Sequence, residues 1–397
     1  MRFSPLVERI SGEGADAWRT HGEASAARDR GEDVIILSVG DPDLETPGPV
    51  IERAIERIRA GDTHYTPAPG RPAIREAIAN AHMARTGQQT QPDNVVYLSG
   101  AQNALFVASM CLAGPGDEIV TFDPMYPTYP ATLEVSGARM VRAPAGPGFR
   151  PDLEALSALV TPRTRAIAWA TPNNPTGVIL SESELSVIAE LARRFDLWLI
   201  SDEVYAGLAP EGRVPGLSRQ LPERVITLGS LSKSHAMTGW RAGWLVGPPE
   251  FTAHAQSLVM CMLFGLPGFI QEAAITALSI APAAERRIRE LCDARLQRFM
   301  TGLAGVAHLR AHPPQAGMFM LVDVRETGLS GYEFMRALYR SERVSVMDGA
   351  AFGRQTAGFV RVCFATDEKQ LDEACQRIRR FCSSGRAAAS SRTFVVP

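Results

Sequence analysis

The sequence predicts an α/β protein, in which a mostly parallel sheet is flanked by helices and joined to a smaller α+β domain. Short runs rich in β-branched and aromatic residues alternate with helical patterns along the middle of the chain. Several of these runs are apolar on both faces, which is typical of strands covered by helices on two sides. The length of 397 residues exceeds the usual size of one hydrophobic core, so we expect two domains.

Six candidate strands follow one another in the middle of the chain. They are "NVVYLSG" (94–100), "EIVTFDP" (118–124), "RAIAWATP" (165–172), "LWLISDEVY" (197–205), "VITLGSLS" (225–232) and "GWLVGP" (243–248). Between two of them, residues 181–196 form a predicted helix that opens with Ser181 and Glu184 at the spacing of a capping box. The stripe of this helix that we expect to be buried contains Leu185, Ile188, Ala192 and Phe195, with Leu191 on its flank.

A second unit is predicted after a long charged helix, "AAERRIRELCDARLQRFM" (283–300), which bridges the two units. Its candidate strands are "MFMLVDV" (318–324), "VSVMDG" (344–349) and "FVRVCFA" (359–365), with helices between and after them. We therefore expect a large α/β domain at residues 48–285. The small α+β domain would contain residues 1–47 and 286–397, with the N-terminal segment packed against it.

Composition argues against several classes of partner. The 41 basic residues are dispersed among 43 acidic ones and leave a net charge of −2, so no basic face for nucleic acid is indicated. No apolar run is long enough to span a membrane, and the N-terminus lacks the apolar core of a signal peptide. The six cysteines show no CxxC spacing, which indicates neither a zinc site nor a disulfide framework. We expect a cytoplasmic protein without metal, nucleic-acid or membrane partners.

Lysine is almost absent from the chain, and one of its two occurrences stands out. Lys369 lies in the acidic, helix-like stretch "TDEKQLDEA" and is predicted to be an ordinary surface residue. Lys233 lies among small and hydroxyl residues in "LGSLSKSHAMTGWRAGW". Arginine keeps its proton, whereas a buried lysine can lose it and form a Schiff base with a carbonyl. We therefore predict that Lys233 serves through its amine; the alternative is a partly exposed lysine at a strand end.

Polar residues collect where the candidate strands end, and ligands of open α/β sheets bind outside the carboxyl ends of the strands. In "LSGAQNAL" the N–H groups of residues 99–102 could hold a phosphate at a helix N-terminus, although a tight turn explains Gly100 equally well. In "SDEVY", Asp202 is either a helix N-cap or a functional acid. In "ATPNNPTG", Asn173 and Asn174 could simply form a turn.

A fourth strand end adds groups that complement these. "GSLSK" brings Ser230 and Lys233 to the same predicted edge, and Arg241 follows eight residues after the lysine. A lysine can bind an aldehyde, an acid can keep a ring nitrogen protonated, and a glycine turn with a serine and an arginine can hold a phosphate. This set of groups is what pyridoxal phosphate requires.

At these residues the sequence resembles the class I/II aminotransferases of the fold-type I pyridoxal-phosphate enzymes. The resemblance extends from "LSVGDPDLETP" to "FVRVCFA", and "SLSKSHAMTGWRAGW" is similar to the family's Schiff-base signature with its spacing intact. It implies that Lys233 holds the cofactor and shuttles the proton, and that Asp202 pairs with the pyridine nitrogen. Tyr205 and Asn174 would bond the phenolic oxygen of the ring, and Tyr126, in "DPMYPTY", would stack on its face.

The same resemblance implies the remaining cofactor contacts. Ser230, Arg241 and the backbone of Ala101 and Gln102 would hold the phosphate. Tyr65, in "HYTPAPG", is similar to a tyrosine that reaches the phosphate of a neighbouring subunit, which implies a homodimer with shared sites.

The implied substrate contacts are fewer. Arg361, in "FVRV", would grip the α-carboxylate of the substrate as a fork, with Gly40 beside it. Three further residues have open interpretations. His235 could act as a general base beside the lysine, Trp18 is either a packing anchor or a pocket wall, and Asp348 stands in a loop where the family usually has proline and could approach the substrate.

The implied activity is a ping-pong transfer of the α-amino group from an L-amino acid to a 2-oxo acid such as pyruvate. Within the family, "ISGEGADAW", "SVGDPD" and "SLSKSHAMTGW" look most similar to arginine–pyruvate transaminases. Glu13, Asp16 and Asp348 are the acids that could face a basic donor, and no second carboxylate-binding arginine can be placed. The alternatives are an aspartate-specific or broad-specificity aminotransferase, or a carbon–sulfur lyase of the same fold type.

Overall fold

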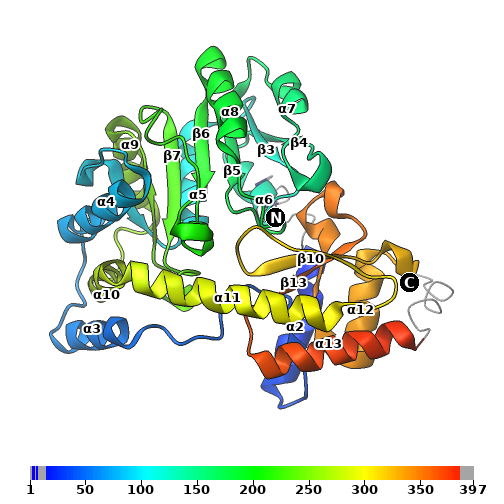
Figure 1. Ribbon diagram of the computed structural model, residues 1–397. Coiled ribbons are helices and arrows are strands. Elements are labelled where there is room, and N and C mark those ends of the chain that lie inside the picture. Colours follow the sequence, from blue (N-terminus) through cyan, green and yellow to red (C-terminus); the bar gives the residue numbers. More distant parts are fainter. Residues whose placement is uncertain (1, 5, 8–14, 385–397) are drawn as a thin grey trace.

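The computed structural model describes residues 2–4, 6–7 and 15–384 and contains a central sheet of seven strands (Figure 1). The strands are parallel except β8, which runs antiparallel to both of its neighbours. In spatial order they are β2 (Val95–Leu98), β8 (Gly243–Val246), β7 (Val225–Ser230), β6 (Trp198–Asp202), β5 (Thr164–Ala170), β3 (Glu118–Phe122) and β4 (Arg139–Ala143). The six predicted strands are thus present, and β4 was not predicted.

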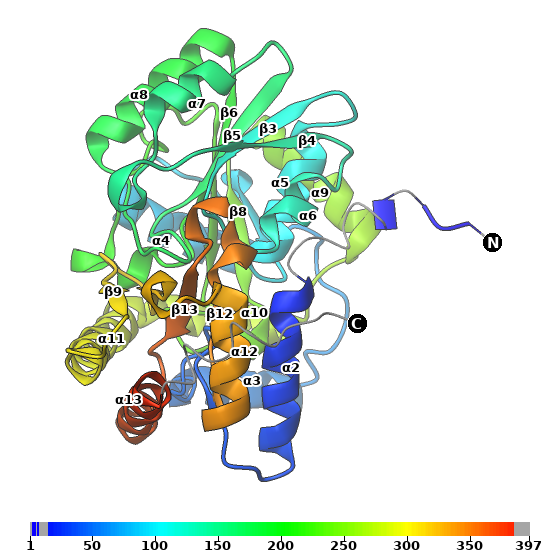
Figure 2. The same cartoon turned by 90° about the vertical axis from the view of Figure 1, so that its right-hand side faces the viewer.

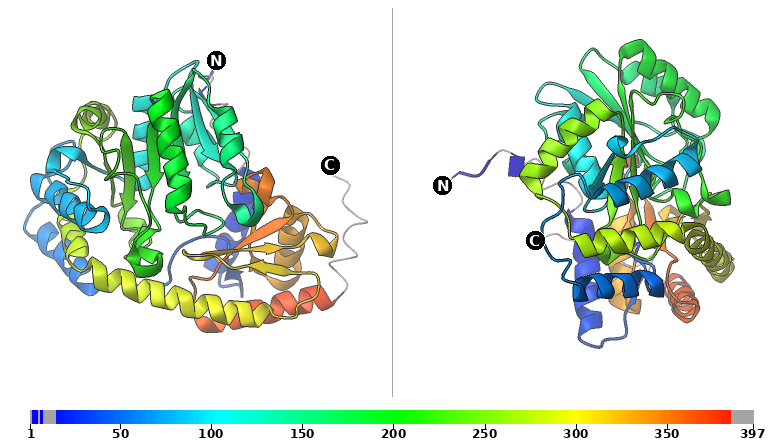
Figure 3. Two further views of the ribbon diagram at one scale, coloured as in Figure 1. Left: turned by 45° about the horizontal axis from the view of Figure 1, so that its top comes forward. Right: turned by 90° about the vertical axis from the view of Figure 1, so that its left-hand side faces the viewer.

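Helices cover both faces of this sheet, as the two-sided apolar runs require (Figure 3). One face packs against α5 (Ala101–Leu112), α6 (Tyr129–Leu133) and α9 (Pro249–Met262). The other face packs against α4 (Pro72–Thr86), α7 (Leu153–Leu159), α8 (Glu182–Phe195) and α10 (Gly268–Ser279), and α3 (Gly48–Arg59) lies against α10. Alternate residues of β5 show the division, since Ala168 belongs to the first core and Ile167 to the second. The predicted fold class is confirmed.

Helix α8 shows where a periodic pattern succeeds and where it fails. The capping box between Ser181 and Glu184 is formed, and Leu185 and Ile188 are buried as predicted. Phe195 is not buried: it is the last residue of the helix and is 38% exposed. Its ring packs instead against the guanidinium of Arg194 at the surface.

A smaller sheet of four antiparallel strands faces the first. Its strands, in spatial order, are β12 (Met347–Asp348), β13 (Phe359–Cys363), β10 (Phe319–Asp323) and β9 (Arg310–His312). The predicted strand at 344–349 is divided, because its first part, β11 (Val344–Ser345), pairs in parallel with β1 (Ile35–Ile36). The N-terminal segment therefore lies with these strands. Neither β1 nor β9 was predicted.

The helices of this second group are α2 (Ala15–Asp29), α12 (Gly331–Glu342) and α13 (Glu368–Ser383). Figure 2 shows α2 lying alongside α12, and Arg336 of α12 donates to Thr20 and pairs with Glu23 of α2. The long helix α11 (Ala281–Leu303) runs from the large sheet to the small one (Figure 1). Because α11 is continuous, the division at residue 285 stays a prediction, supported by the separate cores of the two sheets.

Short 3-10 segments complete the described part of the chain. They are η1 (Pro92–Asn94), η2 (Pro147–Phe149), η3 (Ala206–Leu208), η4 (Pro210–Gly212), η5 (Thr238–Trp240), η6 (Arg325–Thr327), η7 (Gly349–Phe352) and η8 (Arg354–Thr356). Among the described residues, no helix combines the length and the apolar character needed to cross a membrane.

Candidate active site

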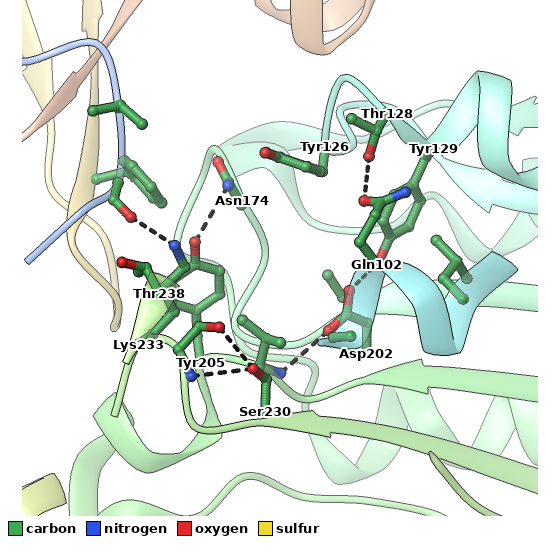
Figure 4. A pocket seen from close by; sticks show the side chains of 18 of the residues that line it. Gln102, Tyr126, Thr128, Tyr129, Asn174, Asp202, Tyr205, Ser230, Lys233 and Thr238 are labelled. Atoms are coloured by element: carbon green, nitrogen blue, oxygen red, sulfur yellow. Dashed lines mark hydrogen bonds between the residues drawn. The ribbon is translucent and has the colours of Figure 1, made fainter. Parts of the chain in front are cut away.

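A cavity of about 340 Å³ lies where the carboxyl ends of β5, β6 and β7 face the small sheet. It collects residues from segments that are far apart in the sequence. All of the predicted site residues except Tyr65 line it: Gly40, Ala101, Gln102, Tyr126, Asn174, Asp202, Tyr205, Ser230, Lys233, Arg241 and Arg361. Figure 4 shows several of these side chains pointing toward one common space.

Lys233 lies in the segment after β7, and its side chain points into this cavity (Figure 4). Its Nζ donates a hydrogen bond to the carbonyl oxygen of Gly40, 2.6 Å away. Burial lowers the pKa of this amine to about 8, because a charged ammonium is poorly solvated there. The amine can therefore become neutral and nucleophilic near physiological pH. Lys369, by contrast, is exposed on α13 as predicted.

Asp202 ends strand β6 and is held by two hydrogen bonds. Its Oδ2 accepts from the hydroxyl of Tyr129 at 2.7 Å, and its Oδ1 accepts from the backbone N–H of Val204 at 3.2 Å. Burial raises the pKa of the carboxyl, and no lysine or arginine of the described segments forms an ion pair with it. Asp202 thus caps the turn and also faces the cavity. Because it has no cationic partner among the described residues, its carboxylate is suited to pair with the protonated ring nitrogen of a ligand.

A buried arginine lies on the opposite side of the cavity. Arg361, on β13, donates from Nη1 to Asn174 Oδ1 at 3.0 Å and from Nη2 to the carbonyl of Ser38 at 2.6 Å. Its guanidinium lies 4.0 Å from the ring centroid of Phe319 and 4.7 Å from that of Phe352. Its Nε has no hydrogen-bond partner among the described residues.

The described surroundings of Arg361 offer no counter-ion for its charge. No carboxylate within the described part of the chain pairs with it, and burial lowers the pKa of the guanidinium. Burying an unpaired cation costs several kcal/mol, on the order of 3–5 when a buried pair is broken. Such an arginine is expected where an anionic ligand supplies the missing partner, which excludes the interpretation of Arg361 as one more surface arginine.

The N-terminus of α5 forms an anion site at the third side of the cavity. The first N–H groups of a helix have no intrahelical acceptor, and here they belong to Ala101 and Gln102. Arg241 lies beside them, with Nη1 on the carbonyl of Thr238 at 2.8 Å and no ion pair to a described carboxylate. Gly100 has φ +82°, and a Cβ there would meet Arg241 Nη2 at 2.5 Å. The glycine is therefore required for this close approach.

The middle of the cavity holds both hydrogen-bond donors and hydrogen-bond acceptors. Asn174 donates from Nδ2 to the hydroxyl of Tyr205 over a long 3.5 Å, so both groups remain available to a ligand (Figure 4). Ser230 Oγ is 2.9 Å from both Ser232 Oγ and the carbonyl oxygen of Ala242. The turn at Asn174 thus also carries a side chain into the cavity.

Trp18 lines the cavity from α2, and like Tyr126 it packs against the cluster of Met347 and Phe352. It is therefore both a wall and an anchor. Other lining residues were not predicted: Val39, Leu105, Thr128, Tyr129, Ala170, Val204, Ser232, Thr238 and Phe319. The sequence offered a signal for Tyr129 and Thr128, which stand in the same "DPMYPTY" motif as Tyr126.

Two interpretations of single residues are wrong. His235 accompanies Lys233 in sequence, but its ring bonds Ser234 Oγ at 2.8 Å and the carbonyl of Ala277 at 3.1 Å, away from the cavity. Burial lowers its pKa to about 4, so it is not a base for this cavity. Asp348 is buried and accepts from the N–H of Ala350 at 3.1 Å, and it does not line the cavity.

The other acids that were predicted to face a basic substrate cannot be located. Glu13 lies outside the described residues, and the side chain of Asp16, at the start of α2, is likewise outside the described part. Tyr65 is not part of the cavity lining; it is 86% exposed and its ring meets that of Phe264 edge-on at 4.8 Å.

Residues 32–378 match the model of a family described as Aminotransferase class I and II. The chain belongs to this family. It is 45% identical to the arginine–pyruvate transaminase of Pseudomonas aeruginosa, over 95% of this chain and 97% of that protein. It is 32% identical to an aspartate aminotransferase of Pyrococcus horikoshii, over 88% of this chain and 90% of that protein.

Solved structures of the family share the fold described above. The aspartate aminotransferase of Thermus thermophilus with maleate superposes with a TM-score of 0.90 at 30% identity, covering 96% of this chain and all of that one. The chain is therefore an aminotransferase, and its cofactor is pyridoxal 5′-phosphate, as in its family. The cavity fits this cofactor, since it offers an amine for the aldehyde, an unpaired acid for the ring nitrogen and a helix N-terminus with an arginine for the phosphate.

Proposed function

We propose that this aminotransferase takes the α-amino group from arginine or another long L-amino acid and gives it to a 2-oxo acid such as pyruvate. One observation carries the proposal: among the described residues only two arginines line the cavity, Arg241 and Arg361. The first lies at the helix N-terminus suited to phosphate, so a single arginine is left for the substrate. A donor with one carboxylate is favoured over a dicarboxylate, and the arginine–pyruvate relative supports this choice.

Lys233 is proposed as the residue that binds the cofactor covalently and then moves the proton. The bound cofactor supplies an electron sink for the negative charge that develops when the substrate Cα–H bond breaks. The amine of Lys233, once displaced by the substrate, would accept the proton from Cα, since its pKa of about 8 leaves a useful neutral fraction. The same amine, once protonated, would be placed to donate that proton on the cofactor side of the transferred nitrogen.

Asp202 is proposed to hold the proton of the ring nitrogen. Its unpaired carboxylate would favour the protonated ring by opposite charge, and the 2.7 Å bond from Tyr129 would keep its Oδ2 in place. Tyr126 would lie against the face of the ring. Asn174 and Tyr205 would bond the phenolic oxygen, for which their weak mutual contact leaves them free.

The phosphate contacts would come from one edge of the large sheet. The N–H groups of Ala101 and Gln102, the hydroxyl of Ser230 and the guanidinium of Arg241 all line this side of the cavity. On the other side, Arg361 would bind the substrate carboxylate as a fork, beside Gly40. Because the two cations lie at opposite sides, the substrate would be held with its Cα near the amine of Lys233.

The choice of donor is tested by comparing amino acids with pyruvate and 2-oxoglutarate as acceptors. We expect arginine to have a higher kcat/KM than alanine or aspartate. We also expect Glu13→Lys or Asp16→Lys to lower the arginine-to-alanine ratio by about tenfold or more, because a charge-assisted hydrogen bond contributes roughly 1.5–3 kcal/mol.

A charge reversal that lies elsewhere on α2 provides the control. Asp29→Lys, at the exposed C-terminal end of that helix, should leave the ratio unchanged. The proposal fails if aspartate has the highest kcat/KM, or if neither Glu13→Lys nor Asp16→Lys changes the ratio more than Asp29→Lys does.

We further propose a homodimer in which Tyr65 completes the phosphate site of the partner subunit. Its hydroxyl cannot serve its own cavity, and its exposed ring continues into an exposed apolar surface formed by Met260, Met262 and Phe264 at the end of α9. Exposed apolar groups that gather in this way usually mark an interface. A cytoplasmic location also stays a prediction, and the six unpaired cysteines agree with it.

Tyr65→Phe is expected to keep the dimer and to weaken binding of pyridoxal phosphate by roughly tenfold, because one hydrogen bond to a charged group is lost. Phe264→Asp is expected to shift the protein toward monomer, since it places a charge in the proposed contact. Sedimentation velocity and cofactor titration measure the two effects. A wild-type protein that sediments as a monomer while holding the cofactor would contradict the shared site.

A further inference from the structure

A chain of side chains connects the N-terminal helix to the arginine that is proposed to bind the substrate. His21, on α2, lies with Nδ1 2.9 Å from Ser38 Oγ. Ser345, on β11, donates from its hydroxyl to the same Ser38 Oγ at 2.9 Å. The carbonyl of Ser38 accepts from Arg361 Nη2 at 2.6 Å. The serine thus stands between the imidazole and the guanidinium.

The hydrogen bonds around Ser38 are compatible with a neutral imidazole at His21. Ser38 Oγ has one proton, and it already accepts the proton of Ser345. Its own proton is then available to His21 Nδ1, which can accept it when that nitrogen carries no proton. The neutral imidazole with its proton on Nε2 satisfies this. Burial and the nearby charges of Arg28 and Arg361 lower the pKa of His21, which favours the same neutral form.

The backbone just before Ser38 is held by hydrogen bonds to β11 and β13. Leu37 donates its N–H to the carbonyl of Ser345 at 2.8 Å, and its own carbonyl accepts from the N–H of Cys363 at 2.8 Å. These bonds hold residue 37, but they do not involve the peptide group that carries the Ser38 carbonyl. The side-chain contacts of Ser38 with His21 and Ser345 therefore hold the same residue whose carbonyl accepts from Arg361.

The same helix also forms part of the cavity wall. Trp18 lies one turn before His21, and the two rings meet edge-on with centroids 5.8 Å apart. Trp18 lines the cavity and packs against Phe352, whose ring stacks on the guanidinium of Arg361. His21 itself is not part of the lining, so it acts only through its neighbours.

We infer that His21 is a positioning residue that links the Trp18 wall of the substrate cavity to Arg361 through the Ser38 carbonyl, and so sets the affinity for the substrate carboxylate. This inference rests on the proposed role of Arg361. A link of this kind would make the position of α2 depend on occupation of the carboxylate site. Its signature is a change in substrate binding without a change in cofactor binding.

The test uses the cofactor-loaded protein and an unreactive carboxylate, 4-methylpentanoate, whose binding is followed by the absorbance of the bound cofactor. His21→Leu removes the acceptor, whereas His21→Asn keeps a polar group near Ser38 Oγ. We expect His21→Leu to weaken carboxylate binding and to raise the KM for alanine by roughly three- to tenfold, as the loss of one hydrogen bond implies. The kcat and the cofactor affinity should be nearly unchanged, and His21→Asn should recover most of the binding.

Two further variants make the result decisive. Ser25→Ala, one turn beyond His21 on the same helix, should bind the carboxylate as the wild type does. Ser345→Ala removes the other contact of Ser38 and should weaken binding in the same direction, which keeps the test valid if His21→Leu fails to fold. The inference is overturned if His21→Leu and Ser345→Ala both bind normally while Arg361→Met does not, or if kcat and cofactor affinity fall together with carboxylate binding. Normal binding by Arg361→Met would instead remove the proposed substrate site.

Discussion

Replacing Lys233 by alanine is expected to reduce turnover by at least about a thousandfold, because both covalent attachment and the transferred proton depend on its amine. The protein should still fold and still bind pyridoxal phosphate, although more weakly. The remaining contacts at Asp202 and at the N-terminus of α5 do not involve the lysine. Steady-state rates and cofactor titration measure the two effects.

The chain provides its own control, since Lys369 is the second of only two lysines. Lys369→Ala should retain full activity, because its side chain is exposed on α13. Borohydride reduction of the loaded wild-type protein, followed by peptide mapping, should place the label on Lys233. A label on Lys369, or the same label in Lys233→Ala, would disprove the assignment.

Replacing Arg361 by methionine is expected to raise the KM for the amino donor by roughly 10- to 150-fold, which corresponds to about 1.5–3 kcal/mol for hydrogen bonds to a charged group. Cofactor affinity should change little. The Tm should also change little, because methionine fills the space between Phe319 and Phe352 and removes a buried charge that has no counter-ion within the described residues. A purely structural arginine would behave differently, and its loss would lower the Tm.

The matched comparison is Arg241→Met, the other arginine of the cavity. It should weaken cofactor binding and leave the affinity of the loaded enzyme for the donor nearly intact. Titration gives the cofactor affinity and the donor affinity of each variant. We expect Arg361→Met to lose mainly donor affinity and Arg241→Met to lose mainly cofactor affinity. If Arg361→Met loses the cofactor and keeps its donor affinity, the two assignments must be exchanged.

Local patterns in the sequence were sufficient for the fold class and for the cavity residues at the strand ends, whereas Gly40, Tyr126, Tyr205 and Arg361 were named through the resemblance to a family. The strand runs could be recognised because a strand covered on both faces has no polar side. Asp202, Asn174 and Lys233 could be grouped before any coordinates were known, because parallel strands bring their carboxyl ends to one edge. Lys233 was conspicuous by composition alone, since a chain that otherwise uses arginine has little need of a surface lysine.

The tertiary structure decided what each side chain faces. His235 and Lys233 are two residues apart, yet one faces the cavity and the other bonds Ala277 on α10. Asp348 was placed near the substrate by its loop, but the fold uses its carboxylate to hold the turn at Ala350. The spacing of residues in the sequence predicts which side of a helix or strand each side chain lies on. What His235 and Asp348 contact depends instead on how distant elements pack against them.

Two hydrogen bonds, from Tyr129 to Asp202 and between His21 and Ser38, also could not be predicted from the sequence. No pattern in the sequence connects Tyr129 with Asp202 or His21 with Ser38, because each pair meets only when a helix, α6 or α2, has packed in its place. The sequence by itself determined which chemistry this protein can carry, since residue types and strand ends are local properties. The tertiary structure alone determined how that chemistry is oriented and supported, because hydrogen bonds between remote segments exist only after the chain has folded.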